Sequence, residues 1–314
     1  MPESVDGAHV AVHTSLGLKK GERLMILVDE PRIGMGGRFL SAALDAKADA
    51  FMVTIPEVGR DGQEPPHPVA RLMREMHAII IATEGSMSHT LARKQATKAG
   101  ARIITMPGIT DEMLGEGGMT ADFRKVHMEA RRLFRIFKGS KVVMVKTDAG
   151  TNLTMSIKGR SWIAEDTGIC HRRGDFTNLP AGELFVSPVA GSAEGEIVVD
   201  GSFRGLVKEG IVVRVESGYA VRIKGAREAV HELNKGGREG RLISKFGIGL
   251  NPKARVIGRE IEDAKVLGCV SIGFGDNSRF GGQIRCPTYL ECVIRSAAVA
   301  LDNQVILRDG KLLV

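Results

Sequence analysis

Four short apolar segments alternate with amphipathic stretches through the first part of the chain. The segments are rich in Ile, Val, Leu and Met and cover residues 23–28, 50–55, 78–82 and 101–105. Between them, helical periodicity predicts helices over residues 37–47, 68–76 and 88–98. Ser88 is suited to cap the last of these helices and Gly100 to end it. Strands that are apolar along most of their length and separated by helices predict a Rossmann-like open parallel sheet, covered on both faces, as a domain over residues 1–138.

The pattern changes after Gly139, where strands with turn chemistry replace the alternation of strands and helices. Residues 141–146 and 152–157 flank a Thr-Asp-Ala-Gly turn and predict a hairpin, and Asp309-Gly310 predicts another near the end of the chain. Further strands are expected over residues 195–199, 211–216, 220–223, 305–307 and 311–314, with one helix over 226–234. We therefore expect a second, β-rich α+β domain over residues 139–314.

Composition favours a compact cytoplasmic protein. Of the 314 residues, 43% are hydrophobic and 26% are charged, which is ordinary for a globular protein of two domains. No apolar run approaches the roughly 20 residues that a membrane helix needs, and residues 1–6 lack the pattern of a signal peptide. The spacing of the four cysteines matches neither a zinc site nor a secreted disulfide scaffold, so reduced thiols are expected.

The formal charge of +7 raises the question of nucleic-acid binding. The densest basic stretch, residues 124–146, overlaps a helical pattern over 120–137 whose apolar residues share one face. That pattern is typical of an amphipathic surface helix. Aromatic residues make up only 4% of the chain, which leaves little material for base stacking. We therefore expect neither a nucleic acid nor a membrane as partner.

Several motifs occur in a fixed order through the second half of the chain. They are Asn-Leu-Pro-Ala-Gly-Glu-Leu-Phe at 178–185, Gly-Ile-Gly-Leu-Asn-Pro at 247–252, Glu-Asp-Ala-Lys-Val-Leu-Gly at 262–268, Gly-Phe-Gly-Asp-Asn at 273–277 and Phe-Gly-Gly at 280–282. In this order they resemble the leucyl aminopeptidases of the aminopeptidase T type and their relatives, which include 2,5-dihydroxypyridine 5,6-dioxygenase. Weaker similarity at 29–31, 62–66 and 106–110 extends the resemblance over nearly the whole chain.

The resemblance implies a metal site and, with it, an aminopeptidase that hydrolyses small peptides or related amides, in a homodimer. Its carboxylate ligand falls on Glu183, its first histidine position on Ser271, and its closing His-x-Asp pair on Tyr289 and Glu291. Hydroxyl groups are poor ligands for a divalent cation because they must lose a proton to bind strongly. The usual zinc or iron site of the family is therefore expected to be absent.

Three alternatives follow for this altered site, which we expect to be formed by distant loops of the second domain. Glu183 and Glu291 could hold Mg²⁺ or Mn²⁺, completed by Glu262 or water. Tyr289 and the carboxylates could instead perform metal-free acid–base chemistry, with Glu262 as general base and Tyr289 supporting the oxyanion. In the third alternative the chain is a non-catalytic peptide or small-molecule binding homologue. Oxidative ring cleavage, as in the dioxygenase relatives, needs iron and is disfavoured by the missing histidines.

A second candidate region is independent of the family resemblance. Ligands of open parallel sheets approach the carboxyl ends of the strands, and here those ends supply Glu30, Glu57 and Glu84 beside Asp29 and Ser86. These residues form an acidic rim in a basic protein. We expect the rim to face the cleft between the domains and to attract a cationic group, such as the amine of a peptide.

Overall fold

The computed structural model describes residues 6–314, which divide into two compact units. The first unit runs to His127 and also contains Asp166–Ala181, and the second comprises Met128–Glu165 and Gly182–Val314. The sequence pattern places a single boundary at residue 138, whereas the chain passes between the units within the helix α6 (Phe123–Phe137) and then returns. The return has a structural cause, since the segment carries a strand of the first unit's sheet.

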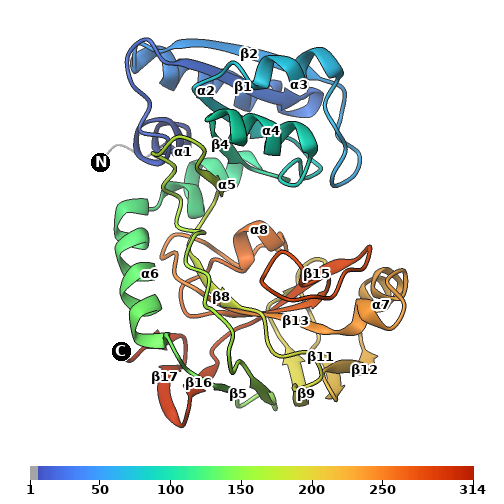
Figure 1. Ribbon diagram of the computed structural model, residues 1–314. Coiled ribbons are helices and arrows are strands. Elements are labelled where there is room, and N and C mark those ends of the chain that lie inside the picture. Colours follow the sequence, from blue (N-terminus) through green and yellow to red (C-terminus); the bar gives the residue numbers. More distant parts are fainter. Residues whose placement is uncertain (1–5) are drawn as a thin grey trace. The chain divides into compact units, whose positions relative to one another are not determined.

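The first unit is built on a five-stranded parallel sheet (Figure 1). The strands lie in the order β2 (Asp49–Ile55), β1 (Arg23–Asp29), β3 (Ala78–Ala82), β4 (Arg102–Thr105) and β7 (Phe176–Asn178), and every neighbouring pair is parallel. β1, β3 and β4 are almost continuously buried, as expected for strands covered on both faces. The predicted Rossmann-like sheet is confirmed.

Helices cover both faces of this sheet. One face packs through Met25, Leu27 and Ile79 against α3 (His67–Met73) and α4 (Leu91–Ala99). The other face carries α2 (Ile33–Asp45), which contacts β1 and β2. The remaining helical segments of this unit are α1 (Gly7–His9), the π-helix Val10–Ser15, the 3₁₀ turns Glu30–Arg32 and Gly118–Thr120, and α5 (Asp111–Glu116).

The ends of α4 show how local sequence fixes a helix. Thr90 accepts a hydrogen bond from the backbone of Arg93 and caps the helix, so the predicted cap at Ser88 is wrong by two residues. The Ser88 hydroxyl is instead within 2.8 Å of the Thr105 hydroxyl. Gly100 ends the helix as predicted, with a φ of +107° that favours glycine.

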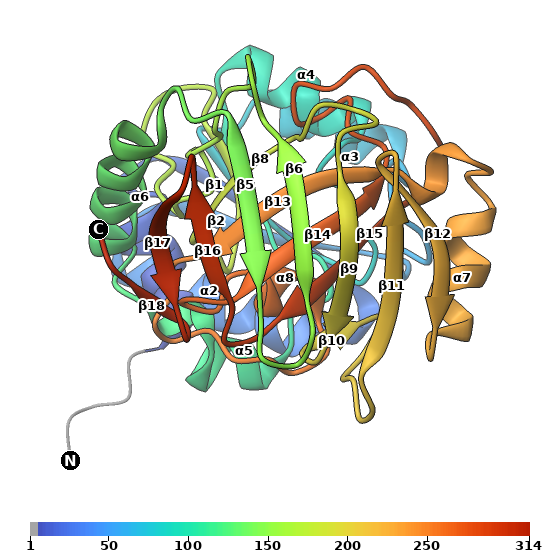
Figure 2. The same ribbon diagram turned by 90° about the horizontal axis from the view of Figure 1, so that it is seen from below.

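The second unit contains two antiparallel sheets (Figure 2). The larger has eight strands in the order β12 (Tyr219–Lys224), β11 (Ile211–Glu216), β9 (Glu194–Val199), β6 (Asn152–Ser156), β5 (Val142–Lys146), β16 (Ala298–Leu301), β17 (Gln304–Arg308) and β18 (Lys311–Leu312). The smaller has five in the order β10 (Ser202–Phe203), β15 (Tyr289–Ile294), β14 (Val270–Gly275), β13 (Ile243–Gly249) and β8 (Glu183–Val186). Besides the part of α6 from Met128 on, the unit contains three short helical segments: α7 (Arg227–Asn234), the 3₁₀ turn Glu239–Arg241 and α8 (Glu260–Asp263).

One continuous apolar core joins the two sheets of the second unit. It contains side chains from both, and Phe246 of β13 packs at its centre with Trp162, whose ring centroid lies 6.0 Å away. The predicted hairpin of β5 and β6 is present. The expectation that loops carry the motifs around Glu183, Ser271 and Tyr289 is wrong, because all three residues lie in strands of the smaller sheet.

No helix within residues 6–314 is long and apolar enough to cross a membrane. The longest helix, α6, carries five lysine and arginine residues and buries only one face. The prediction that the N-terminal hexapeptide is not a signal peptide concerns residues that lie, apart from Asp6, outside the described part of the chain.

The packing of Phe246 generates a test of the second unit's core. We expect Phe246→Ala to lower the free energy of unfolding by about 3–5 kcal/mol, because a fully buried ring is removed and the sheets around it cannot close the cavity. Leu206→Ala is the matched control, since Leu206 is 53% exposed, and should change stability by less than about 0.5 kcal/mol. Urea denaturation measures both. Equal losses in the two variants would contradict the assigned core.

Candidate functional site

The smaller sheet of the second unit has two chemically different faces. Residues that alternate along its strands point to the core, among them Phe246 and Ile248 of β13 and Ile272 of β14. The cross-strand register places the intervening residues together on the opposite face: Glu183 and Phe185 of β8, Lys245, Gly247 and Gly249 of β13, Ser271, Gly273 and Gly275 of β14, and Tyr289, Glu291 and Val293 of β15. This second face, which we call the polar face, carries the motif residues.

Glu183 is the most completely buried charge on the polar face. Its side chain has no exposed area, and both carboxylate oxygens have partners. Oε1 lies 2.6 Å from Lys245 Nζ and accepts a hydrogen bond of 2.6 Å from the Ser271 hydroxyl, while Oε2 accepts one of 2.6 Å from Lys265 Nζ. Burial alone would raise the pKa of Glu183, but the attraction and hydrogen bonds of the two ammonium groups outweigh it and lower the pKa to about 2.

Lys245 links the two carboxylates of the site. Its Nζ pairs with Glu183 and donates a hydrogen bond to Glu291 Oε1, so the ammonium group lies between residues from opposite ends of the motif region. The Lys245 side chain is buried, and its Nζ lies 4.8 Å from the centre of the Phe185 ring. An ammonium group in this position satisfies two buried anions at once.

Glycines make room for this cluster. Gly247 lies between Phe185 and Ser271 in the sheet, and a Cβ there would overlap the carboxylate of Glu183 and the hydroxyl of Ser271. Gly273 lies between Lys245 and Glu291, and a Cβ there would come within 2.9 Å of the Tyr289 hydroxyl. The glycine-rich character of the motifs is therefore explained by space for charged side chains above the strands.

Tyr289 brings a neutral polar group to the same face. Its ring packs against Phe280, with centroids 5.2 Å apart, and Phe280 in turn packs edge-on against Phe185. Burial, followed by the nearby carboxylates of Glu291, Glu183 and Glu260, raises the pKa of Tyr289 well above its usual value of 10. The hydroxyl is buried and makes no hydrogen bond of standard geometry within residues 6–314, but the Glu291 carboxylate lies within its reach. Tyr289 therefore stays protonated at neutral pH and is a potential hydrogen-bond donor.

Glu262, the predicted general base, lies in α8 and is fully buried. Its Oε1 accepts a hydrogen bond of 3.2 Å from the backbone of Arg255. The helix is tied to the cluster through Lys265, whose side chain reaches Glu183 and whose backbone nitrogen donates to the carbonyl of Glu262. The structure thus brings Glu183, Ser271, Tyr289 and Glu291 together, and the role of Glu262 as base stays a prediction.

The carboxyl ends of the parallel strands also carry the predicted acidic residues, and an arginine, Arg32, pairs with two of them. Asp29 is fully buried and accepts hydrogen bonds from the backbone of Glu84 and from Arg32. Arg32 also pairs with the carboxylate of Glu84. Glu30 and Glu57 are exposed. The rim is therefore less acidic than its sequence suggests, because a buried arginine neutralises part of it, and its role in substrate binding stays a prediction.

The donor set of the polar face does not fit a metal ion. Within residues 6–314 no group of three or more His, Cys, Asp or Glu side chains is placed to hold one. Glu183 uses both oxygens on lysines and Ser271, and Lys245 Nζ already lies between Glu183 and Glu291. A divalent cation bound by both carboxylates would have to displace an ammonium group of the same chain.

Lys245 and Lys265 are the site residues that sequence reasoning missed. Lys265 lies within the Glu-Asp-Ala-Lys-Val-Leu-Gly motif, and Lys245 lies two residues before Gly247. The available signal was alternation: Phe246 and Ile248 alternate with Lys245 and glycine, as Val270, Ile272 and Phe274 alternate with serine and glycine. That period of two predicts strands, and it places Lys245 on the same face as the motif glycines.

Comparison with known proteins agrees with this architecture. A protein from Pseudomonas putida described as 2,5-dihydroxypyridine 5,6-dioxygenase is 24% identical over 251 residues, which cover 74% of this chain and 70% of that protein. The solved structure of 2,5-dihydroxypyridine dioxygenase from the same organism superposes with a TM-score of 0.79 at 20% identity, covering 98% of this chain and 96% of the other.

A second solved structure, wild-type AmpT from Thermus thermophilus, superposes with a TM-score of 0.71 at 17% identity and covers 98% of each chain. The predicted relation to both groups is confirmed at the level of fold, although the peptidase activity is not confirmed. The family model described as 2,5-dihydroxypyridine 5,6-dioxygenase matches residues 8–314. The chain therefore belongs to the 2,5-dihydroxypyridine 5,6-dioxygenase family.

Proposed function

We propose that this chain is a metal-independent member of its family that binds a small molecule through an oxygen atom. The observation that carries the proposal is the position of Lys245 Nζ, which pairs with Glu183 and Glu291 together. The resemblance to the aminopeptidase T type assigns metal ligands to these two carboxylates. Here the two positive charges that a divalent cation would bring are supplied by Lys245 and Lys265.

The chemistry of the ammonium groups differs from that of a metal ion. A bound metal polarises a carbonyl oxygen and lowers the pKa of its water ligand because it keeps an open coordination position. Lys245 and Lys265 neutralise Glu183, but their short contacts are already made to carboxylates of the same chain. They offer no equivalent of an open coordination position, which supports a binding role over metal-dependent hydrolysis or ring cleavage.

Tyr289 indicates which class of ligand the site would bind. The buried Tyr289 hydroxyl makes no hydrogen bond of standard geometry within residues 6–314 and has the Glu291 carboxylate beside it, so a ligand acceptor would compete with Glu291 for this donor. Because the raised pKa keeps Tyr289 protonated, the matching group on the ligand is an acceptor such as a carbonyl or ring oxygen. Amides, peptides and hydroxylated heterocycles such as 2,5-dihydroxypyridine, for which the relatives are named, all carry such oxygens.

The same hydroxyl favours one catalytic alternative, the metal-free hydrolysis of small amides. Tyr289 would donate to the oxygen of a tetrahedral intermediate, and Glu262 would accept a proton from water, the roles that the motifs predict for these residues. This alternative differs from the binding proposal in one measurable respect, which is turnover of an aminoacyl amide.

The lysine-for-metal proposal predicts how Lys245→Ala behaves. Removal of the ammonium group leaves Glu183 and Glu291 without their shared cation, so the free energy of unfolding should fall by about 3–5 kcal/mol. Added Mn²⁺ should restore part of this stability in the variant and should leave the wild type unchanged. Thermal unfolding with Mn²⁺ or with EDTA measures both effects.

Lys235→Ala is the control for this experiment, because Lys235 forms an exposed ion pair with Glu232, and it should cost less than about 1 kcal/mol. The proposal would be wrong if wild-type protein purified without chelator carried one transition-metal ion per chain that Glu183→Ala removed. It would equally fail if Mn²⁺ stabilised the wild type as much as the variant.

The lowered pKa of Glu183 predicts a component of acid sensitivity. The folded-state pKa of about 2 lies below the usual value of 4.5. Ionised Glu183 therefore contributes fully to the free energy of unfolding above about pH 4.5, and this contribution is lost as the pH falls toward 2. Its size is on the order of 3 kcal/mol. Urea unfolding between pH 5 and pH 3 should show a flatter dependence in Glu183→Gln than in the wild type. Glu216→Gln, which changes an exposed carboxylate, should follow the wild-type curve.

Turnover assays separate binding from catalysis. We expect the wild type neither to hydrolyse leucine p-nitroanilide nor to consume O₂ with 2,5-dihydroxypyridine, with or without added Fe²⁺. Should EDTA-resistant amide hydrolysis be found, Tyr289→Phe should lower it by about 10²-fold, as expected for loss of one oxyanion donor. Iron-dependent O₂ uptake that tracks protein concentration would refute metal independence.

A further inference from the structure

A basic pocket lies within the first unit, on the edge of the sheet opposite the acidic rim. Its cavity measures about 580 Å³, within the range of pockets that hold small ligands. Arg23 is the first residue of β1, His77 precedes β3 and Arg102 is the first residue of β4, so the pocket lies at the amino ends of the parallel strands. The acidic residues Asp29 and Glu84 follow the carboxyl ends of the same strands.

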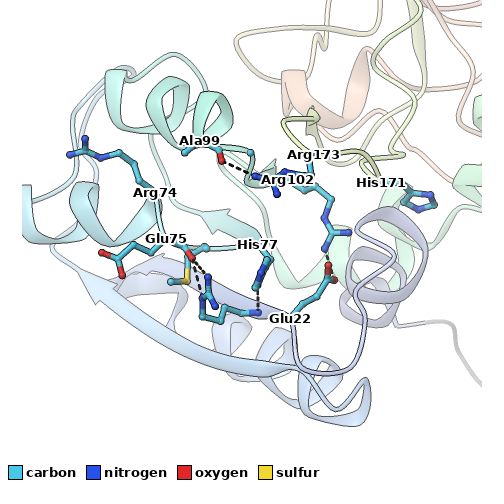
Figure 3. A pocket seen from close by; sticks show the side chains of 11 residues that line it. Glu22, Arg74, Glu75, His77, Ala99, Arg102, His171 and Arg173 are labelled. Atoms are coloured by element: carbon cyan, nitrogen blue, oxygen red, sulfur yellow. Dashed lines mark hydrogen bonds and ion pairs between the residues drawn. The ribbon is translucent and has the colours of Figure 1, made fainter.

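Four arginines from separate parts of the chain line the pocket (Figure 3). They are Arg23, Arg74, Arg102 and Arg173, and they face two glutamates, Glu22 and Glu75. Four cations against two anions leave a formal charge of +2 with the two lining histidines neutral. In Figure 3 Arg74 lies at the left, apart from Arg173, Arg102 and His77.

Three of the guanidinium groups are held in place by hydrogen bonds that use only some of their N–H donors. Arg23 donates through Nε and Nη2 to the carbonyl of Glu75, just beyond the end of α3. Arg173 donates through Nη2 to the carbonyl of Ala99 at the end of α4. Arg102 donates through Nη2 to Glu22 at 2.6 Å. These contacts fix the positions of the cations, which reduces the entropy lost on binding a ligand.

Donors remain for a ligand after these contacts are counted. Within residues 6–314 the structure gives no partner to Nη1 of Arg23, to Nε and Nη1 of Arg173, or to the guanidinium of Arg74. His77 adds another, because its Nδ1 accepts the backbone N–H of Arg23 and its Nε2 then carries the proton. The pocket thus presents N–H donors and no uncompensated carboxylate other than Glu75.

This arrangement requires Gly100 for reasons of space as well as backbone conformation. A Cβ at this position would come within 2.6 Å of a guanidinium nitrogen of Arg173. The left-handed glycine that ends α4 therefore lets Arg173 lie flat over the helix end. Fixed guanidinium groups of this kind bind phosphate and carboxylate groups through paired N–H donors.

We propose that this pocket binds a small anion that carries two or more phosphate or carboxylate groups. Cations on separate sides of the cavity match a ligand with separated charges better than a single ion. The binding site is distinct in its residues from the polar face of the second unit. The proposal does not depend on the function proposed for that face.

Isothermal titration of the full chain with sodium pyrophosphate, and separately with citrate, tests the proposal at an ionic strength balanced with NaCl. We expect saturable binding of at least one of the two anions, and the stronger of them identifies phosphate or carboxylate as the preferred group. Arg74→Ala/Arg173→Ala should weaken this binding by about tenfold or more, because it removes the cations with the most free donors.

Arg71→Ala is the control, since Arg71 is an exposed arginine of the same helix region that does not line the pocket, and it should change affinity less than about twofold. Arg74→Ala alone covers the case in which the double variant does not fold, because within residues 6–314 the structure gives the Arg74 guanidinium no partner, and it should still weaken binding severalfold. Absence of saturable heat with both anions would overturn the proposal. So would equal affinity in the wild type and a folded double variant.

Discussion

The ammonium group of Lys245, bound to Glu183 and Glu291, is the interaction on which the second unit depends. A buried carboxylate without a cation would be neutralised by protonation or would destabilise the fold by several kcal/mol. Lys245 and Lys265 prevent both outcomes for Glu183, whose pKa falls to about 2. The central strands can therefore carry charges in a region that is otherwise sealed from water.

The same interaction explains the unusual composition of the smaller sheet. Its core face is apolar and packs against the larger sheet, so the opposite face must hold the charged side chains without lifting the strands apart. Gly247 and Gly273 provide that space, because a side chain at either position would overlap the cluster. Glycine weakens a strand intrinsically, and here the ion pairs across the strands offset that cost.

The sequence predicted the first unit more fully than the second for a physical reason. Strands such as β1 and β3 are buried on both faces and are recognisable as continuous apolar runs. β13 and β14 are buried too, but one face is made of glycine, serine and lysine, so the segments resemble polar loops. Their alternation of apolar and small residues was the signal for strands.

Other features could not be obtained from the sequence pattern alone. The motifs placed Glu183, Ser271, Tyr289 and Glu291 in one site, and the cross-strand register puts all four on the polar face, while their roles stay predictions. Alternation indicates the face on which Lys245 lies, but its position opposite Gly273 follows only from the strand register, which includes a bulge in β13. The return of Asp166–Ala181 to the first unit likewise depends on a short strand, β7, which local pattern does not reveal.

The net charge of such a site and its chemistry are separable. Two lysines supply the same positive charge as one divalent cation, so the buried carboxylates and the fold around them can persist without the ion. The difference is the open coordination position. A metal ion exchanges its water ligands, whereas Lys245 and Lys265 are fixed to the chain and already bonded to Glu183. In the proposed function the chain keeps this electrostatic framework, and the protonated Tyr289 hydroxyl beside Glu291 is the donor that a ligand would meet.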